Sequence, residues 1–322
     1  MASRSLLLDE GRAAMAARAA RLAKADLVTQ AVVEFTSQQG VMGGYYAAAA
    51  GEPDEVCEAI RDQYRPRFAG DEPPAGPVGV AVAVADKLDT ICGMFAIEQP
   101  PTGSSDPFAV RRSAIGVIAM LRLAPAGALD ELIGAALDAY EAQGLAFDRS
   151  ATLEGVRTFF QGRLASIARD EGVSPDTVEA VSAVGVVDPA DFLDRAHALE
   201  DARSERRELF EDLAQAYARA AHLADASLGT DVDASLLGDA ERSLLDACDR
   251  GRSRVRDALA ERDFSGAISA LAELKAPIDR FFDDVLVMDE DTAVRENRLR
   301  LLNRFVEVFV GVADVGALSR KK

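Results

Sequence analysis

Two carboxylates in the first half of the chain have a spacing that could serve chemistry. Asp86 and Asp89 are three residues apart, which places both on one face of a helix. A metal-dependent phosphohydrolase would need several His and Asp ligands around one ion, yet the only histidines are His197 and His222. No GxSxG motif presents a serine nucleophile. We therefore predict no catalytic residue and no metal site, and expect Asp86 and Asp89 to line a polar groove.

A row of basic residues near the C-terminus suits the binding of phosphates. The row, which includes one amide, consists of Arg295, Asn297, Arg298, Arg300 and Arg304. Spacings of three and four residues place the arginines on neighbouring faces of one helix. Guanidinium groups hold phosphates in a bidentate manner, and an amide can read base edges. Taken alone, the pattern favours a solvated helix face whose arginines pair with acids such as Asp291 and Glu296, whereas a helix that binds RNA would present a contiguous basic strip.

The surrounding pattern predicts helices that position both groups. An apolar run over residues 78–97 carries the carboxylate pair, and residues 291–313 carry the arginines opposite an apolar stripe. Proline directly after Ser174 and after Asp188 marks two more helix starts. Further helices are expected over residues 6–38 (one or two helices), 53–64, 108–123, 128–143, 151–170, 175–184, 206–224, 239–262, 264–274 and 277–287.

The first helical region contains an apolar stripe and then a glycine cluster. The stripe, at helical spacing, consists of Leu27, Val28, Ala31, Val32 and Phe35. The cluster at residues 40–44 lacks the lysine of a phosphate-binding loop and follows no strand. It is therefore interpreted as a helix break at a tight helix–helix junction, where glycines permit close approach of two backbones.

Composition favours an all-α fold. Hydrophobic residues make up 49% of the 322 residues, aromatic residues only 6%, and tryptophan is absent. The core must therefore be built mainly from Ala, Leu, Val and Ile, and alanine has the highest helix propensity. A chain of this length predicts two or three domains. We place them at residues 1–125, 126–203 and 204–322, the last being a helical bundle.

Charge and cysteine usage exclude several classes of protein. The formal net charge is −18, which argues against non-specific coating of nucleic acid and requires any RNA contact to be focal. Cys57, Cys92 and Cys248 have no zinc-site spacing and suit thiols in a reducing cytosol. No secretory signal or membrane-spanning run is apparent. We therefore expect a cytoplasmic protein.

Several stretches resemble the beta subunit of bacterial tetrameric glycyl-tRNA synthetase. In the first half they are EFTSQQGVMGGYYA at residues 34–47, QYRPRFAGD at 63–71, ADKLDT at 85–90 and PTGSSDPFAVRR at 101–112. In the second half they are DRFFDDVLVM at residues 279–288 and RENRLRLL at 295–302. The resemblance covers about residues 24–318 and is weakest in the middle.

The resemblance implies a helical HD-like domain followed by an anticodon-binding bundle of the arginyl-tRNA synthetase type. In that family the alpha subunit carries the class II aminoacylation site and uses ATP and Mg, so this chain would bind no cofactor itself. Its implied partners are glycine tRNA and the alpha subunit of a heterotetramer, with no DNA and no membrane. The chain would thus be part of a ligase without its aminoacylation site. Because the family's subunit is longer, we expect a fragment or a shortened paralogue.

The resemblance also implies which residues contact tRNA. In the C-terminal bundle they are Arg219, His222, Arg295, Asn297, Arg298 and Arg304. In the HD-like domain, Arg65, Arg67, Arg111 and Arg112 would grip the tRNA body or brace Asp86 and Asp89. Two features depart from the family pattern, since Ala218 replaces a lysine and His222 stands at an asparagine position. Residues 208–322 also hold 16 Lys and Arg against 23 Asp and Glu, a net of −7.

Two alternatives stay open at this point. One is a helical scaffold or paralogue that holds other protein subunits and touches no RNA, which the negative charge and the Ala-rich helices suit. The other is a remnant HD-type metal phosphohydrolase centred on Asp86 and Asp89. Arginines locked into salt bridges on the last helix would favour the scaffold.

Overall fold

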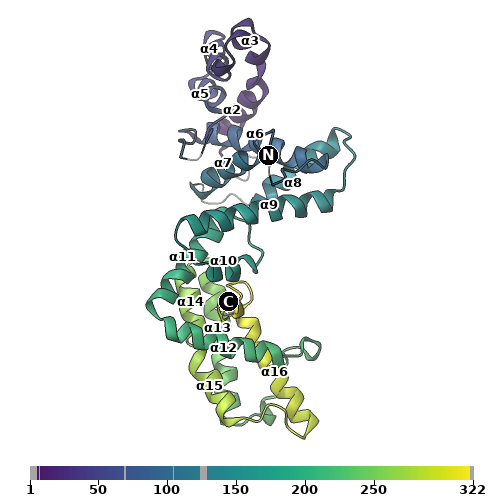
Figure 1. Cartoon of the computed structure of the whole chain (residues 1–322), viewed down its shortest axis with the longest axis vertical. Helices are drawn as coiled ribbons and strands as arrows, with labels where there is room; N and C mark the ends of the chain where they lie inside the picture. The colour runs from purple at the N-terminus through teal and green to yellow at the C-terminus, as the bar shows by residue number, and fades with distance from the viewer. Residues whose placement is uncertain (1–5, 7, 69, 104, 124–128, 320–322) are drawn as a thin grey trace. The chain divides into compact units, whose positions relative to one another are not determined.

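A computed structural model describes residues 6, 8–68, 70–103, 105–123 and 129–319 of the chain. Within these ranges the regular structure consists of α-helices and short 3₁₀ helices, with no strand (Figure 1). The all-α prediction is confirmed. None of the helices in these ranges is long and apolar enough to cross a membrane.

The chain divides into two compact units by its internal contacts. The first unit comprises residues 1–164 and 187–190, and the second comprises residues 165–186 and 191–322. In Figure 1 the first unit runs from purple to teal, and most of the second is green and yellow. The predicted division into three parts stays a prediction.

Helix α6 (Pro77–Ala96) is central to the first unit and packs against α2, α5, α7 and α8. It is apolar on nearly every side, which is typical of a helix surrounded by others. The remaining elements are α2 (Glu10–Leu22), η1 (Ala25–Val28), α3 (Gln30–Glu34), η2 (Thr36–Gln38), α4 (Val41–Ala49), α5 (Asp54–Asp62), α7 (Val110–Leu123), α8 (Leu129–Ala142) and α9 (Arg149–Asp170). Helix α9 runs across the division between the units.

The glycine cluster lies at a tight junction between α4 and α5, as predicted. A Cβ atom on Gly43 would lie 2.9 Å from Ile60 Cγ2, and one on Gly44 would lie 3.0 Å from the Cys57 carbonyl oxygen. The helix break is shorter than predicted, because only Gly40 precedes α4 and has a left-handed φ of 81°. Gly43 and Gly44 lie inside the helix, where their missing side chains allow α5 to approach.

The predicted apolar stripe over residues 27–35 does not form one core-facing helix face. Val28 is 86% exposed and Phe35 68% exposed, whereas Val32 is buried. Buried Asp26 accepts hydrogen bonds from the backbone N–H groups of Gly40 (2.7 Å) and Gly43 (3.1 Å), which ties the start of this segment to the start of α4. Residues 25–38 form three short helical elements, η1, α3 and η2, in place of one continuous helix, so helical spacing does not map onto one face.

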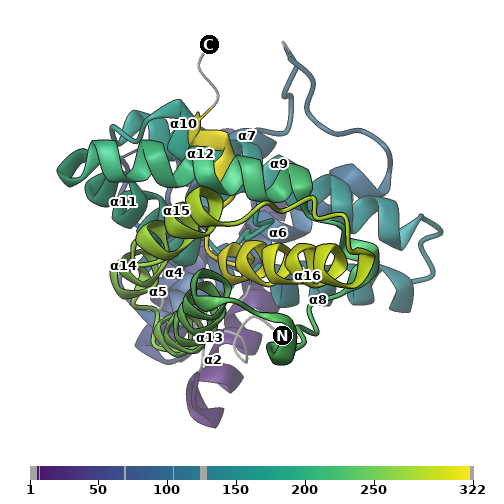
Figure 2. The same cartoon turned by 90° about the horizontal axis from the view of Figure 1, so that it is seen from below.

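The second unit is a bundle in which α16 (Thr292–Phe309) packs against α12 (Arg207–Leu223) and α13 (Asp239–Ala260) (Figure 2). Its buried face presents Leu301, Leu302, Phe305 and Phe309, the last two in ring contact at 5.2 Å. The other elements are α10 (Pro175–Ser182), α11 (Pro189–Glu205), η3 (Ala226–Leu228), η4 (Ala234–Leu236), α14 (Phe264–Ala272), α15 (Lys275–Asp284) and η5 (Val315–Ser319).

The connection between α12 and α13, residues 224–238, contains the sequence Asp-Ala-Ser-Leu twice. In each copy the aspartate side chain accepts a hydrogen bond from the backbone N–H of the serine two residues later. The distances are 3.0 Å from Ser227 to Asp225 and 2.9 Å from Ser235 to Asp233. Such turns are self-contained and give this connection, the 224–238 loop, a defined local shape.

Candidate functional site

A groove in the first unit collects basic side chains from four parts of the sequence. Its volume is about 530 Å³, and its walls come from the segment between α2 and η1, from η2 and the residue after it, from the segment after α5, from α6 and from the start of α7. The charged and aromatic side chains that line it are Lys24, Tyr64, Arg67, Asp86, Lys87, Phe108 and Arg112. Sequence reasoning named three of these, Arg67, Asp86 and Arg112, and the structure brings them to one place.

The charge of the groove is positive although the chain as a whole is acidic. Four of the lining residues are Lys or Arg, and Asp86 is the carboxylate among them. Asp86 is paired with Lys24 at 2.5 Å. Among the described residues, neither Arg67 nor Arg112 forms an ion pair. The groove therefore holds a local excess of positive charge, which attracts anions.

Lys87 is the most buried of these cations, with only 6% of its surface exposed. Its ammonium group donates to the carbonyl oxygen of Tyr64 at 3.1 Å. Burial lowers the pKa of Lys87 from 10.5 to about 8, although Asp86 and Asp71 partly oppose the shift. Burial disfavours the charged ammonium unless a counter-ion is close to it. An anion bound beside Lys87 would therefore be stabilised by its charge.

The two aspartates that were expected to line a polar groove have different contacts. Asp86 lines the groove, whereas one carboxylate oxygen of Asp89 accepts a hydrogen bond from the Tyr140 hydroxyl at 2.9 Å. In the described parts of the chain no three His, Cys, Asp or Glu side chains are grouped to hold a metal ion.

The other two arginines predicted for this unit have partners near them in sequence. Arg65 lies 3.8 Å from Asp62 and 4.0 Å from Glu72. Arg111 donates to the carbonyl oxygen of Thr102, and its backbone N–H donates to Asp106 at 3.1 Å. Arg111 thus braces the loop before α7.

The arginines of α16 are engaged inside the second unit. Arg298 is the most enclosed: it pairs with Glu241 and with Asp289, each at 2.6 Å, and donates to the Leu286 carbonyl at 2.9 Å. Only 16% of its side chain is exposed, and Glu241 is buried. This bonding leaves Arg298 little capacity to bind a phosphate unless its partners move away.

Arg295, Arg300 and Arg304 also have internal partners. Arg295 donates to the Asp289 carbonyl (2.7 Å), Arg300 pairs with Glu296 (3.3 Å) and Arg304 pairs with Asp249 (2.5 Å). Helix α16 therefore does not present a contiguous strip of unpaired arginines. Their contact with RNA stays a prediction, and it would require exchange of these partners.

Two asparagines of α16 hold the 224–238 loop by its backbone. Asn297, 1% exposed, accepts from the Asp233 N–H at 2.7 Å and donates to the Asp233 carbonyl at 3.0 Å. Asn303 donates to the carbonyls of Asp225 (2.6 Å) and Gly229 (2.7 Å). A side chain as buried as Asn297 reaches a ligand only through the loop that it positions.

Arg219 and His222, both on α12, are exposed. The guanidinium of Arg219 stacks over the ring of Phe282, 4.0 Å from its centre. A stacked guanidinium keeps its N–H edges available for hydrogen bonds. Of the residues predicted for the second unit, Arg219 is therefore the one whose geometry best suits an external contact.

Comparison with known proteins assigns both halves of the chain. Residues 2–183 match the family described as glycyl-tRNA synthetase beta subunit, and residues 213–312 match the family described as DALR anticodon binding domain. The chain belongs to the glycyl-tRNA synthetase beta subunit family. It is 42% identical over 315 residues to the glycine–tRNA ligase beta subunit of Desulforudis audaxviator, covering 97% of this chain and 45% of that protein.

Two other members of the family give similar figures. The glycine–tRNA ligase beta subunit of Chromohalobacter salexigens is 42% identical over 319 residues, covering 96% of this chain and 45% of that protein. That of Acinetobacter baylyi is 42% identical over 311 residues, covering 94% and 44%. The chain thus spans about half the length of the curated relatives it matches.

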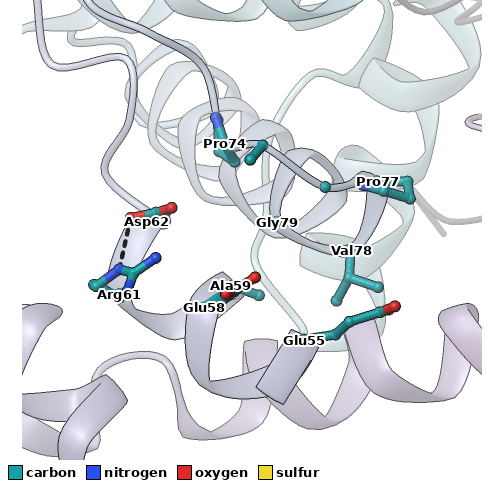
Figure 3. Close-up of a pocket in the computed structure, with 11 residues that line it drawn as sticks. Glu55, Glu58, Ala59, Arg61, Asp62, Pro74, Pro77, Val78 and Gly79 are labelled. Carbon is teal, nitrogen blue, oxygen red and sulfur yellow. Dashed lines mark hydrogen bonds and ion pairs between the residues drawn. The ribbon is translucent and has the colours of Figure 1, made fainter. Parts of the chain in front are cut away.

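A second hollow of this family member has the opposite electrostatic character. It has a volume of about 280 Å³ and lies between α5 and the start of α6 (Figure 3). Glu55, Glu58 and Asp62 line it together with Arg61, which pairs with Asp62 at 3.2 Å. Three carboxylates against one arginine disfavour a polyanion in this hollow.

Sequence reasoning missed Lys24, Lys87 and Phe108 as lining residues of the groove. Lys87 carried a usable signal, because a lysine within the long apolar run of residues 78–97 is strongly disfavoured unless it has a function or a partner. Lys24 and Phe108 carried none, because each lies in an irregular segment whose position depends on packing.

Proposed function

We propose that this chain is the tRNA-binding portion of a glycine–tRNA ligase beta subunit, which positions glycine tRNA for ATP-dependent aminoacylation by a separate alpha subunit. The observation that carries the proposal is the order of the two matches on one chain, a synthetase beta-subunit region followed by an anticodon-binding region. On this proposal the chain binds no cofactor, ATP and Mg belong to the alpha subunit, and the complex works in the cytoplasm.

Electrostatics support a division of roles between the units. The groove, with Lys24, Arg67, Lys87 and Arg112, is a focal cationic site on a chain of net charge −18. Such a site can hold tRNA phosphates, because two of its arginines have no ion pair among the described residues. The second unit would contribute shape and a small number of contacts, chiefly through Arg219 and the 224–238 loop.

Binding of labelled glycine tRNA across a salt series tests the proposal. We expect measurable affinity at low salt and a linear fall of log affinity with log salt, whose slope counts the phosphate contacts. The double variant Arg67→Ala, Arg112→Ala should reduce both the affinity and the slope. The matched control is Arg12→Ala, which removes an exposed arginine that pairs with Asp9, the residue that caps the start of α2. Absence of binding at every ionic strength, even with the alpha subunit supplied, would overturn the proposal.

A second candidate function is a scaffold for protein subunits that touches no RNA. The observation that favours it is the internal pairing of Arg298, Arg300 and Arg304, together with the net charge of −7 over residues 208–322. Capture of the chain by the purified alpha subunit, with and without glycine tRNA, separates the two functions. A scaffold would bind equally in both conditions and would not retain tRNA.

A further inference from the structure

The side chain of Lys87 lines the groove and passes Gly116 of α7, which has no side chain to obstruct it. A Cβ atom on Gly116 of α7 would lie 2.9 Å from Lys87 Cε. The glycine therefore leaves room for the lysine stem between α6 and α7. The ammonium group at its end is bonded to the Tyr64 carbonyl, and no carboxylate of the described residues lies within ion-pair distance. The fold thus holds a buried cation that forms no ion pair with any carboxylate of the described residues, although Asp86 and Asp71 lie near enough to influence its pKa.

The two carboxylates nearest to Lys87 have other partners. Asp86 is paired with Lys24, and Asp71 accepts a hydrogen bond from the backbone N–H of Arg67 at 2.8 Å. The remaining groups around the groove are cationic or neutral, namely Arg67, Arg112 and the Tyr64 phenol. An anion placed among them would meet Lys87 and two arginines that have no ion pair among the described residues.

The groove also has an apolar wall and a size that limits its occupant. Phe108, on the loop before α7, lines it and is 55% exposed, so the ring is accessible. Aromatic faces of this kind stack nucleobases. A volume of about 530 Å³ falls in the range of small-molecule pockets and is too small for a folded RNA element.

We propose that this groove is a binding site for a single nucleotide, whose phosphate contacts Lys87 and Arg112 while its base stacks on Phe108. Two sources supply this chemistry, an unpaired nucleotide of an RNA chain and a free mononucleotide. The RNA source rests on the function proposed above, whereas the free mononucleotide does not. Lys24 and Arg67 complete the positive rim, with Asp86 orienting Lys24.

Binding of a phosphate in the groove should be accompanied by the uptake of a proton. An anion beside Lys87 favours the charged ammonium and so raises its pKa from about 8 toward the ordinary lysine value. At pH 8 about half of the empty sites would therefore take up a proton when the phosphate binds. Asp86, Asp71, Tyr64, Lys24, Arg67 and Arg112 also face this region, so a variant of Lys87 is needed to assign the proton.

The experiment is titration calorimetry of the full chain with adenosine monophosphate, inorganic phosphate and a short single-stranded RNA. Titrations at pH 8 in two buffers of different ionisation enthalpy measure the proton taken up. We expect Lys87→Met to weaken the binding of adenosine monophosphate on the order of tenfold and to abolish proton uptake. Phe108→Ala should weaken binding of the nucleotide about threefold or more and leave inorganic phosphate unchanged.

Controls make each outcome decisive. Arg12→Ala removes the same charge from the far end of α2 and should change affinity by less than about twofold. Arg112→Ala is an exposed change that tests the phosphate position without disturbing the core. Nucleotide binding without tRNA binding would support this site and overturn the proposed function. Conversely, tRNA binding unaffected by Lys87→Met, together with no response to adenosine monophosphate at millimolar concentration, would overturn the site alone.

Discussion

In the first unit, Lys87 is buried without a carboxylate partner among the described residues, and Arg67 and Arg112 line the same groove without ion pairs. In the second unit, Arg298 is nearly as enclosed but is bonded to two carboxylates and a carbonyl. In both regions, arginines were predicted to contact tRNA. The difference teaches that the partners of a basic side chain, and not its presence, decide whether it can serve a ligand.

Arg298→Ala should have the largest effect on stability. The change leaves Glu241, which is 3% exposed, as a buried charge without its partner, at a cost of about 3 kcal/mol in the free energy of unfolding. Thermal and urea unfolding of the variant measures this cost. Arg256→Ala is the matched control, because its side chain is 75% exposed and its ion pair is worth about 0.5 kcal/mol at most. Equal effects of the two variants would contradict the contrast between the units.

Lys87→Met should act in the opposite direction. The pKa of Lys87 falls from 10.5 to about 8 on folding, so its charge destabilises the folded state by about 3 kcal/mol below pH 8, against about 1 kcal/mol for the lost hydrogen bond to Tyr64. The variant should therefore be about 2 kcal/mol more stable than the wild-type chain at pH 7.

The pH dependence of that difference sharpens the test. Between pH 8 and 10.5 the unfolded chain binds more protons at this lysine than the folded chain, so the stability of the wild type rises with pH in this window. The advantage of Lys87→Met should shrink accordingly. Unfolding midpoints measured at several pH values across the window check this, and a destabilised variant would show instead that Lys87 is structural.

Asn303→Ala should have a moderate and local effect. The substitution removes hydrogen bonds to the carbonyls of Asp225 and Gly229, which are solvated once released, so we expect a loss of about 1 kcal/mol. Hydrogen exchange should become faster for amides of the 224–238 loop and stay unchanged in the core of α13. Unaltered exchange in the loop would show that α16 does not hold it.

Arg112→Ala should have the smallest effect and touch affinity rather than stability. One exposed guanidinium that contacts a phosphate is worth about 1 kcal/mol, so glycine tRNA affinity should fall roughly fivefold at low salt. Arg304→Ala provides the comparison, because its arginine is already paired with Asp249 and should change affinity less. Filter binding or anisotropy at low salt measures both, and a larger loss for Arg304→Ala would reverse the assignment of the two units.

Sequence reasoning reached much of the fold and part of the groove. The long apolar run became α6, the proline after Ser174 begins α10, and the Asp291 side chain caps α16, accepting from the Ala293 N–H at 2.8 Å. Arg67 and Arg112 were named and do line the groove. The stripe at residues 27–35 failed because the segment forms three short helical elements in place of one helix, which spacing along the sequence did not reveal.

The sequence alone determined that the chain is helical and where most helices lie, because caps, prolines and apolar periodicity act within a few residues of each other. Tertiary structure decided the partner of each charged side chain. Arg298 meets Glu241 across 57 positions of sequence, while Lys87 meets a backbone carbonyl 23 positions away. Spacing within one helix cannot encode such pairings, since they depend on which helices pack together and how deeply each side chain is buried.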